Sequence, residues 1–165
     1  MNLYILRHGI AVEPGSPGYA KDADRPLTPE GERKLGQIAE AMEALDLTFD
    51  LILSSPCLRA RQTAEIMAEV FHARKKLEFT DNLTPGASPK KLVELLNGLT
   101  PQPEDVLLSG HEPFLSGLIS LLVSGEPGLS AELGDRSARL GHASGRSCLA
   151  WHCEQGGSFR KPRLH

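Results

Sequence analysis

The sequence predicts a three-layer α/β/α sandwich, a single domain around a mostly parallel central sheet. Over residues 2–125, short apolar runs alternate with longer segments whose apolar residues recur every three or four positions. The chain has 165 residues, of which 40% are hydrophobic and 24% charged. That size and composition are typical of one globular domain that buries its own core. We therefore expect a single domain over residues 1–165.

The chain begins with a predicted strand, loop and helix. Asn2–Leu6 is a short apolar run typical of a buried strand, and it leads into Arg7. Residues 14–26 hold several prolines and glycines, which predicts a loop. Thr28 suits a helix N-cap and Pro29 the first helical position. The apolar residues of this helix share one face: Leu35, Ile38, Ala39, Met42 and Leu45.

Three more strand and helix pairs are predicted downstream. The expected strands cover residues 49–53, 77–80 and 105–108. The expected helices cover residues 57–72, 89–98 and 113–123. Residues 126–145 are rich in glycine and serine and give no assignment. The last segment predicts a hairpin, with strands at 146–153 and 158–164 on either side of Gly156 and Gly157.

Composition excludes several classes of protein. Lys and Arg number 18 and Asp and Glu 21, and this net charge of −3 argues against broad nucleic-acid binding. Three cysteines are too few for a disulfide framework. The apolar run before Arg7 is too short for a signal peptide, and no run reaches the length of a membrane span. We expect a cytoplasmic protein that does not bind membranes.

Unusual polar residues follow three of the predicted strands. These are Arg7-His8-Gly9, then Ser54-Ser55-Pro56 with Arg59 shortly after, and Gly110-His111. Parallel sheets carry their binding sites just beyond the carboxyl ends of the strands. The three segments are therefore expected to converge on one pocket.

The residue types in that pocket suit phosphoryl chemistry. Arginine guanidinium groups bind phosphate oxygens in pairs and keep their charge. A neutral imidazole such as His8 can attack phosphorus, and a second such as His111 can stabilise the charge on the phosphoryl oxygens. Gly9 would let the backbone approach the phosphate. None of these steps needs a metal ion or another cofactor.

Four motifs in order resemble those of a known family. Leu6–Gly9 is similar to the RHG signature of the histidine phosphatase superfamily, also called phosphoglycerate-mutase-like. Leu27–Gly31, Ser54–Ala64 and Gly110–Pro113 resemble its LTxxG, SSPLxRARQTA and late GH segments. The small size and the Asp24–Thr28 string point to the SixA-type phosphohistidine phosphatases. The resemblance covers roughly residues 2–125 and implies the three-layer fold of that superfamily.

The resemblance also implies a role for each site residue. His8 would be the nucleophile that forms a phosphohistidine intermediate, and Arg7 and Arg59 would hold the phosphoryl oxygens. His111 would bind the phosphoryl group, and Arg25 would reach the rim of the site. Arg61 lies two residues beyond Arg59, about 200° around a helix, so one of the two is expected to face away.

Two departures from the family pattern bear on the substrate. The stretch after residue 80 holds Asp81 where many members have a catalytic glutamate, and the 51 residues between Arg59 and His111 leave little room for a cap. Glu112 also replaces the usual asparagine of SixA-type chains. A phosphorylated imidazole needs little help from an acid in leaving, and an open site admits a protein side chain. Phosphohistidine on a phosphoprotein is thus the expected substrate.

Other readings remain open from sequence alone. One is a small-molecule phosphatase or a mutase-like enzyme, and another is a non-catalytic module that recognises phosphate. Ser54 and Ser55 lack the G-x-S-x-G frame of a nucleophile and suit strand-end packing and helix capping. Cys57 is expected to be a small buried residue. The late group of His142, Cys148, His152 and Cys153 is not expected to hold zinc, because Cys148 and His152 would sit about 13 Å apart along a strand.

Overall fold

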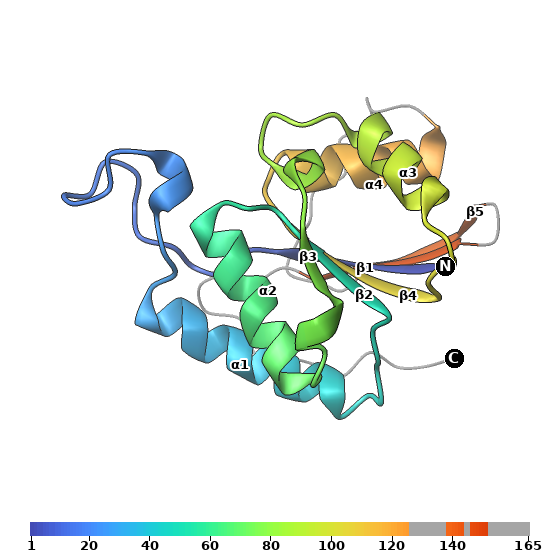
Figure 1. Cartoon of the computed structure of the whole chain (residues 1–165), viewed down its shortest axis with the longest axis horizontal. Coiled ribbons are helices and arrows are strands. Elements are labelled where there is room, and N and C mark those ends of the chain that lie inside the picture. The colour runs from blue at the N-terminus through green and yellow to red at the C-terminus, as the bar shows by residue number, and fades with distance from the viewer. Residues whose placement is uncertain (126–137, 144–145, 152–165) are drawn as a thin grey trace.

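The computed structural model describes residues 1–125, 138–143 and 146–151. Its centre is a six-stranded sheet in the order β3-β2-β4-β1-β6-β5 (Figure 1). The strands are β1 Asn2–Arg7, β2 Leu51–Ser54, β3 Leu77–Phe79, β4 Asp105–Gly110, β5 Ala138–Ala143 and β6 Arg146–Trp151. Neighbouring strands run parallel except for β5, which is antiparallel to β6. The predicted mostly parallel sheet is confirmed.

Helices cover both faces of this sheet and complete the three layers (Figure 1). They are α1 Pro29–Glu43, α2 Leu58–Val70, α3 Pro89–Gly98 and α4 Phe114–Ser124. The helices α1 and α2 pack on one face, and α3 and α4 pack on the other. The α/β/α sandwich predicted from the alternation of strands and helices is therefore confirmed.

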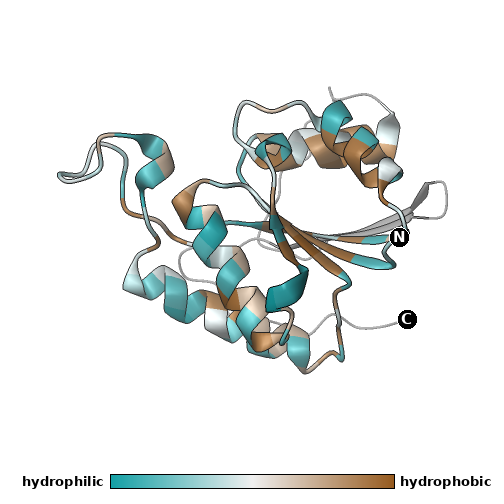
Figure 2. Ribbon diagram, in the orientation of Figure 1, coloured by the Kyte–Doolittle hydropathy of each residue, from teal (hydrophilic) through white to brown (hydrophobic). Residues whose placement is uncertain are grey.

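The core follows from the alternation of side chains along the strands. Leu3 and Ile5 of β1 face the cluster formed with α3 and α4, whereas Tyr4 and Leu6 face the cluster formed with α1 and α2. Strands β2 and β4 are accordingly apolar along most of their length (Figure 2). Burial of each large aliphatic side chain contributes about 1.5–3 kcal/mol to the stability of the fold.

The long segment between β1 and α1 forms an extended loop with a closed base. Val12 donates its amide to the carbonyl of Pro26 at 2.9 Å, and Thr28 donates to the carbonyl of Ile10 at 2.8 Å. Thr28 also caps α1 by accepting the amide of Gly31 at 3.0 Å, as predicted. A Cβ at position 31 would lie 2.2 Å from the Ile10 carbonyl oxygen, so only glycine allows this close approach.

Three short 3₁₀ turns connect the larger elements. These are η1 Asp22–Asp24, η2 Arg74–Lys76 and η3 Asp81–Leu83. The first lies within the long loop and packs beside α2, the helix that follows β2. This placement brings the loop to the carboxyl-terminal edge of the sheet.

Two predicted elements need correction. The second strand begins at Leu51 instead of Phe49. Phe49 precedes the strand, and its buried ring packs edge-on against the rings of Tyr4 and Phe71. The antiparallel partner of β6 is β5, which lies upstream at Ala138–Ala143. The other edge of β6 pairs with β1, so a hairpin with residues 158–164 is the wrong pairing for this strand. Residues 158–164 themselves lie outside the described part of the chain.

Among the described residues, no helix is both long and apolar enough to cross a bilayer.

Candidate active site

Three strand ends meet at one edge of the sheet. The amide of His8, just after β1, donates to the carbonyl of Gly110 at the end of β4, at 3.0 Å. The amide of Ser55, just after β2, donates to the carbonyl of Ser109 at 3.0 Å. These bonds extend the sheet register by one residue and place His8 beside His111, with ring centroids 5.1 Å apart. The convergence predicted from the polar strand ends is present in the structure.

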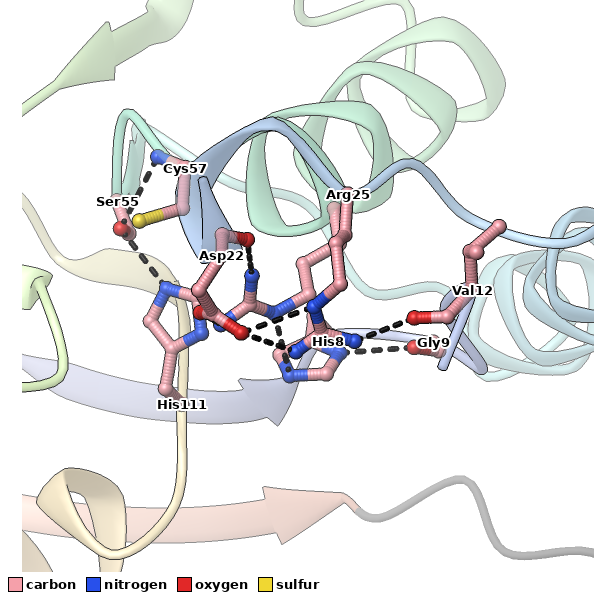
Figure 3. A network of polar contacts seen from close by, with 9 residues as sticks. His8, Gly9, Val12, Asp22, Arg25, Ser55, Cys57 and His111 are labelled. Atoms are coloured by element: carbon pink, nitrogen blue, oxygen red, sulfur yellow. Dashed lines mark hydrogen bonds and ion pairs between the residues drawn. The ribbon is translucent and has the colours of Figure 1, made fainter. Parts of the chain in front are cut away.

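His8 has a defined tautomer. Its Nδ1 lies 2.8 Å from the carbonyl oxygen of Gly9. A carbonyl only accepts, so Nδ1 carries the proton and Nε2 keeps its lone pair. Arg59 Nε donates to that Nε2 at 3.1 Å (Figure 3). The imidazole is therefore a neutral ring held with its unprotonated nitrogen toward a guanidinium group.

Arg59 uses every nitrogen of its guanidinium group. Besides the bond to His8, Nη1 donates to the backbone carbonyl of Asp22 at 2.6 Å, and Nη2 pairs with Asp22 Oδ2 at 2.8 Å. Arg59 is only 4% exposed, on the first turn of α2. A buried cation of this kind needs an anion, and Asp22 supplies it.

Asp22 also binds Arg25, at the other side of the same carboxylate (Figure 3). Arg25 Nε and Nη2 donate to Asp22 Oδ1 at 2.9 and 2.6 Å, and its Nη1 donates to the carbonyl of Val12. Sequence reasoning missed Asp22. The only signal was its spacing of three residues from Arg25, and nothing there distinguishes it from the neighbouring Asp24.

His111 is fixed by a serine. Its Nε2 lies 2.9 Å from Ser55 Oγ, and that oxygen accepts the amide of Cys57 at 3.3 Å. A hydroxyl both donates and accepts, so this bond holds the His111 ring in place in either tautomer. The Nδ1 atom of His111 is buried without a hydrogen-bond partner in the described chain. Ser54 and Ser55 were expected to pack at the strand end and to cap a helix. Both are buried at the end of β2, but α2 has no side-chain cap, and Ser55 positions His111 instead.

Gly9 supports the site through its neighbours. Its amide donates to Thr63 Oγ1 at 3.1 Å, and a Cβ there would lie 2.6 Å from Leu35 Cδ1. The sequence placed Gly9 among the phosphate-binding residues, but in the structure its amide is used by Thr63 and its carbonyl by His8. Gly9 thus orients the His8 ring and packs against α1.

Two further arginines, Arg7 and Arg61, lie in different environments. Arg7 is the last residue of β1, and its charge contributes to the low pKa of His8. Arg61 is half-exposed and pairs with Glu65 at 3.4 Å along the outer face of α2. The helical geometry therefore turns Arg59 inward and Arg61 outward, as its spacing predicts.

Three other residues singled out in the sequence lie as follows. Glu112 turns toward α4, where its Oε2 accepts the Ser116 hydroxyl at 2.7 Å. Asp81 is exposed on η3 and is not among the residues of the network in Figure 3. Cys57 is half-buried at the cap of α2, so the expectation of a buried residue is wrong: the chain reaches the helix from the surface at Pro56. Within the described ranges, no group of three or more His, Cys, Asp or Glu side chains is placed to hold a metal ion.

Both histidines are held in the neutral form. Burial is the main cause that lowers the pKa of His8 to about 4, and the charges of Arg59, Arg7 and Arg25 add to it. Burial also lowers the pKa of His111 to about 3, with the charges of His8 and Arg59 contributing. At neutral pH the site therefore holds two uncharged imidazoles among guanidinium groups.

This predicts a pH-dependent stability. Below pH 6.5 the unfolded chain binds protons at these histidines before the folded chain does. The free energy of unfolding should therefore fall as the pH drops from about 6.5 to about 4 for His8 and to about 3 for His111. Urea unfolding at several pH values measures this, with a shallower decline expected in His8→Gln and His111→Gln. An unchanged decline in both, equal to that of the surface control His72→Gln, would contradict it.

Comparison with known proteins agrees with this arrangement. Residues 3–84 match the family described as the histidine phosphatase superfamily (branch 1). The chain is 35% identical over 155 residues to an uncharacterized protein of Picosynechococcus sp., covering 93% of this chain and 92% of that protein. It is 30% identical over 127 residues to the phosphohistidine phosphatase SixA of Escherichia coli K12, covering 76% of each chain.

A solved structure gives the same result. The structure of the protein histidine phosphatase SixA complexed with tungstate is 29% identical and superposes with a TM-score of 0.66, covering 77% of this chain and 80% of that one. The chain belongs to the histidine phosphatase superfamily, and its enzyme class is phosphatase. Within the superfamily it is similar to the SixA proteins.

Proposed function

We propose that this phosphatase hydrolyses phosphohistidine on a phosphoprotein through a covalent intermediate on His8, without a metal ion. The observation that carries the proposal is the neutral His8 ring, with Nδ1 bound to Gly9 and Nε2 directed at Arg59. A histidine in this state is unprotonated at Nε2 at neutral pH, because its pKa is lowered to about 4, and it can attack phosphorus once Arg59 turns to the phosphoryl oxygens.

The reaction takes place in two displacements. His8 Nε2 forms a bond to phosphorus as the bond from phosphorus to the substrate nitrogen breaks, and the substrate imidazole leaves with its electron pair. Water then attacks the phosphorus of the His8 intermediate, which releases orthophosphate and restores the neutral ring. Arg7, Arg59 and Arg25 supply the positive charge that stabilises the phosphoryl oxygens in both steps.

His111 contributes a hydrogen bond to the same oxygens. Nδ1 of His111 is buried without a hydrogen-bond partner among the described residues, and a buried polar atom in this state is costly. When the Ser55 hydroxyl donates to Nε2, the ring proton lies on Nδ1, and a phosphoryl oxygen can then accept it.

The acids near the site favour a nitrogen leaving group. Asp22 is held as a carboxylate, because hydrogen bonds from Arg25, the larger cause, and from Arg59 lower its pKa. The Oε2 atom of Glu112 accepts the Ser116 hydroxyl on α4. An alkoxide needs a proton from a placed acid, whereas the imidazole of a protonated phosphohistidine leaves without charge. The similarity to SixA supports the same substrate class.

The site also suits a protein substrate. Between Arg59 and His111 the described chain contains the rest of α2, η2, β3, η3, α3 and β4. These are the elements of the sandwich itself, so the stretch between these two residues adds no separate cap domain over the edge of the sheet.

The test is phosphate release from a small histidine-containing protein phosphorylated with phosphoramidate, in the presence of EDTA. We expect release to continue in EDTA, at a higher kcat/KM than for sugar phosphates or p-nitrophenyl phosphate. Rapid turnover of the small esters with none of the phosphoprotein would contradict the substrate assignment and favour a small-molecule phosphatase. Loss of release in EDTA that added metal restores would contradict the metal-independent mechanism.

A further inference from the structure

The two guanidinium groups at the proposed phosphoryl site are bound by one carboxylate of the protein. Asp22 Oδ1 accepts from Arg25, and Asp22 Oδ2 accepts from Arg59. These are the same charge-assisted bonds that a phosphoryl oxygen forms with arginine. A phosphoryl group that binds Arg59 and Arg25 through these same N–H donors therefore replaces Asp22 on them.

The exposures of the three side chains show which partner can leave. The side chains of Arg59 and Arg25 are 5% and 11% exposed, whereas that of Asp22 is 58% exposed. Asp22 also belongs to a short 3₁₀ turn of the long loop, whereas Arg59 is anchored in α2. The arginines are thus fixed parts of the site, and the carboxylate is the part that can turn into solvent.

The same contact covers the nucleophile. With Nη1 and Nη2 on Asp22, Arg59 is oriented so that Nε donates to His8 Nε2. A lone pair that accepts this bond is not directed at phosphorus. When the Asp22 carboxylate leaves, Nη2 is freed and Nη1 keeps only its bond to the Asp22 backbone carbonyl, so the guanidinium can turn toward the phosphoryl oxygens and uncover Nε2.

We infer that Asp22 is the resident anion of the phosphoryl site: its carboxylate competes with the substrate phosphoryl group for Arg59 and Arg25, and it leaves when that group binds. The inference rests on the proposed assignment of these arginines as phosphoryl ligands. A dianionic phosphoryl group outcompetes a carboxylate because it brings a second charge and a third oxygen. Asp22 thereby raises the affinity that an anion needs in order to bind the two arginines, and it speeds the release of orthophosphate.

The experiment measures orthophosphate binding by calorimetry and by inhibition of turnover. Asp22→Asn and Asp22→Ala should bind orthophosphate about three- to tenfold more tightly than wild type, the range expected for loss of one competing ion pair. KM for the substrate should fall by a similar factor while kcat does not rise. Asp24→Asn removes the same charge from the same turn, and its affinity should stay within twofold of wild type.

Two other results have separate meanings. Equal or weaker orthophosphate binding in both Asp22 variants, with binding still lost in Arg59→Ala, would overturn the inference and make Asp22 a residue that positions the arginines. If Arg59→Ala binds orthophosphate as wild type does, the assignment of the phosphoryl site is wrong and the inference falls with it. Orthophosphate is the product for any phosphatase substrate, so neither result depends on phosphohistidine.

Discussion

Replacing His8 by alanine is expected to lower kcat by at least about 10³-fold, because removal of a nucleophile leaves only the binding and charge stabilisation of the site. In wild type, rapid quenching during turnover of a ³²P-labelled substrate should trap label on the protein. The bond should be labile to acid and stable to alkali, as expected for a phosphorylated imidazole nitrogen. His8→Ala and His8→Gln should carry no label.

The control for this experiment is His72→Gln. It removes an exposed histidine just beyond α2 and should leave both the rate and the trapped label unchanged. The covalent mechanism is rejected if His8→Ala keeps more than a tenth of the wild-type rate. Binding of phosphate without turnover in the wild type would instead support a module that recognises phosphate.

Replacing Arg59 has the second largest expected effect. Arg59→Ala should lower kcat/KM by about 10²- to 10³-fold, since loss of one preorganised donor to the reacting oxygens costs about that much. Arg59→Lys should recover only part of this loss, because an ammonium group keeps the charge but cannot bind His8 and two oxygens in one plane. Steady-state kinetics with the same phosphoprotein measure both variants.

Arg61→Ala is the matched control for Arg59. It removes the same charge two residues along the same helix, where the side chain is half-exposed and pairs with Glu65. Its kcat/KM should remain within about twofold of wild type. Equal losses of kcat/KM in Arg59→Ala and Arg61→Ala would show that net charge, and not the hydrogen bonds of the Arg59 guanidinium group, determines the rate. Circular dichroism of each variant separates these effects from unfolding.

Local patterns in the sequence were sufficient for most of the fold. The N-cap at Thr28 and the spacing of apolar residues in α1 predict that helix because both depend on neighbours within one turn. The polar strand ends predict where His8, Arg59 and His111 meet, since parallel strands end on the same edge. The partner of β6 could not be predicted in this way, because pairing depends on which strand edge is available in three dimensions.

The parts of the site that sequence missed depend on side-chain orientation. Asp22 and Asp24 are equivalent in the sequence, and only the fold of the long loop brings Asp22 to Arg59. Ser55 reads as a helix cap, and its contact with His111 requires β2 and β4 to end side by side. The sequence predicts Gly9 as a phosphate ligand, but in the structure its amide donates to the Thr63 hydroxyl.

The Thr63 hydroxyl has a wider consequence. It accepts the amide of Gly9 and donates to the carbonyl of Arg59 at 2.7 Å, so one side chain joins the residue after His8 to the helix turn that carries the guanidinium group. His8 and Arg59 come from positions 51 residues apart and acquire their spacing only when α2 packs on the sheet. A chain folded only in part has both residues but not the contact between them. Under the proposed function, activity therefore depends on completed packing of α2 on the sheet.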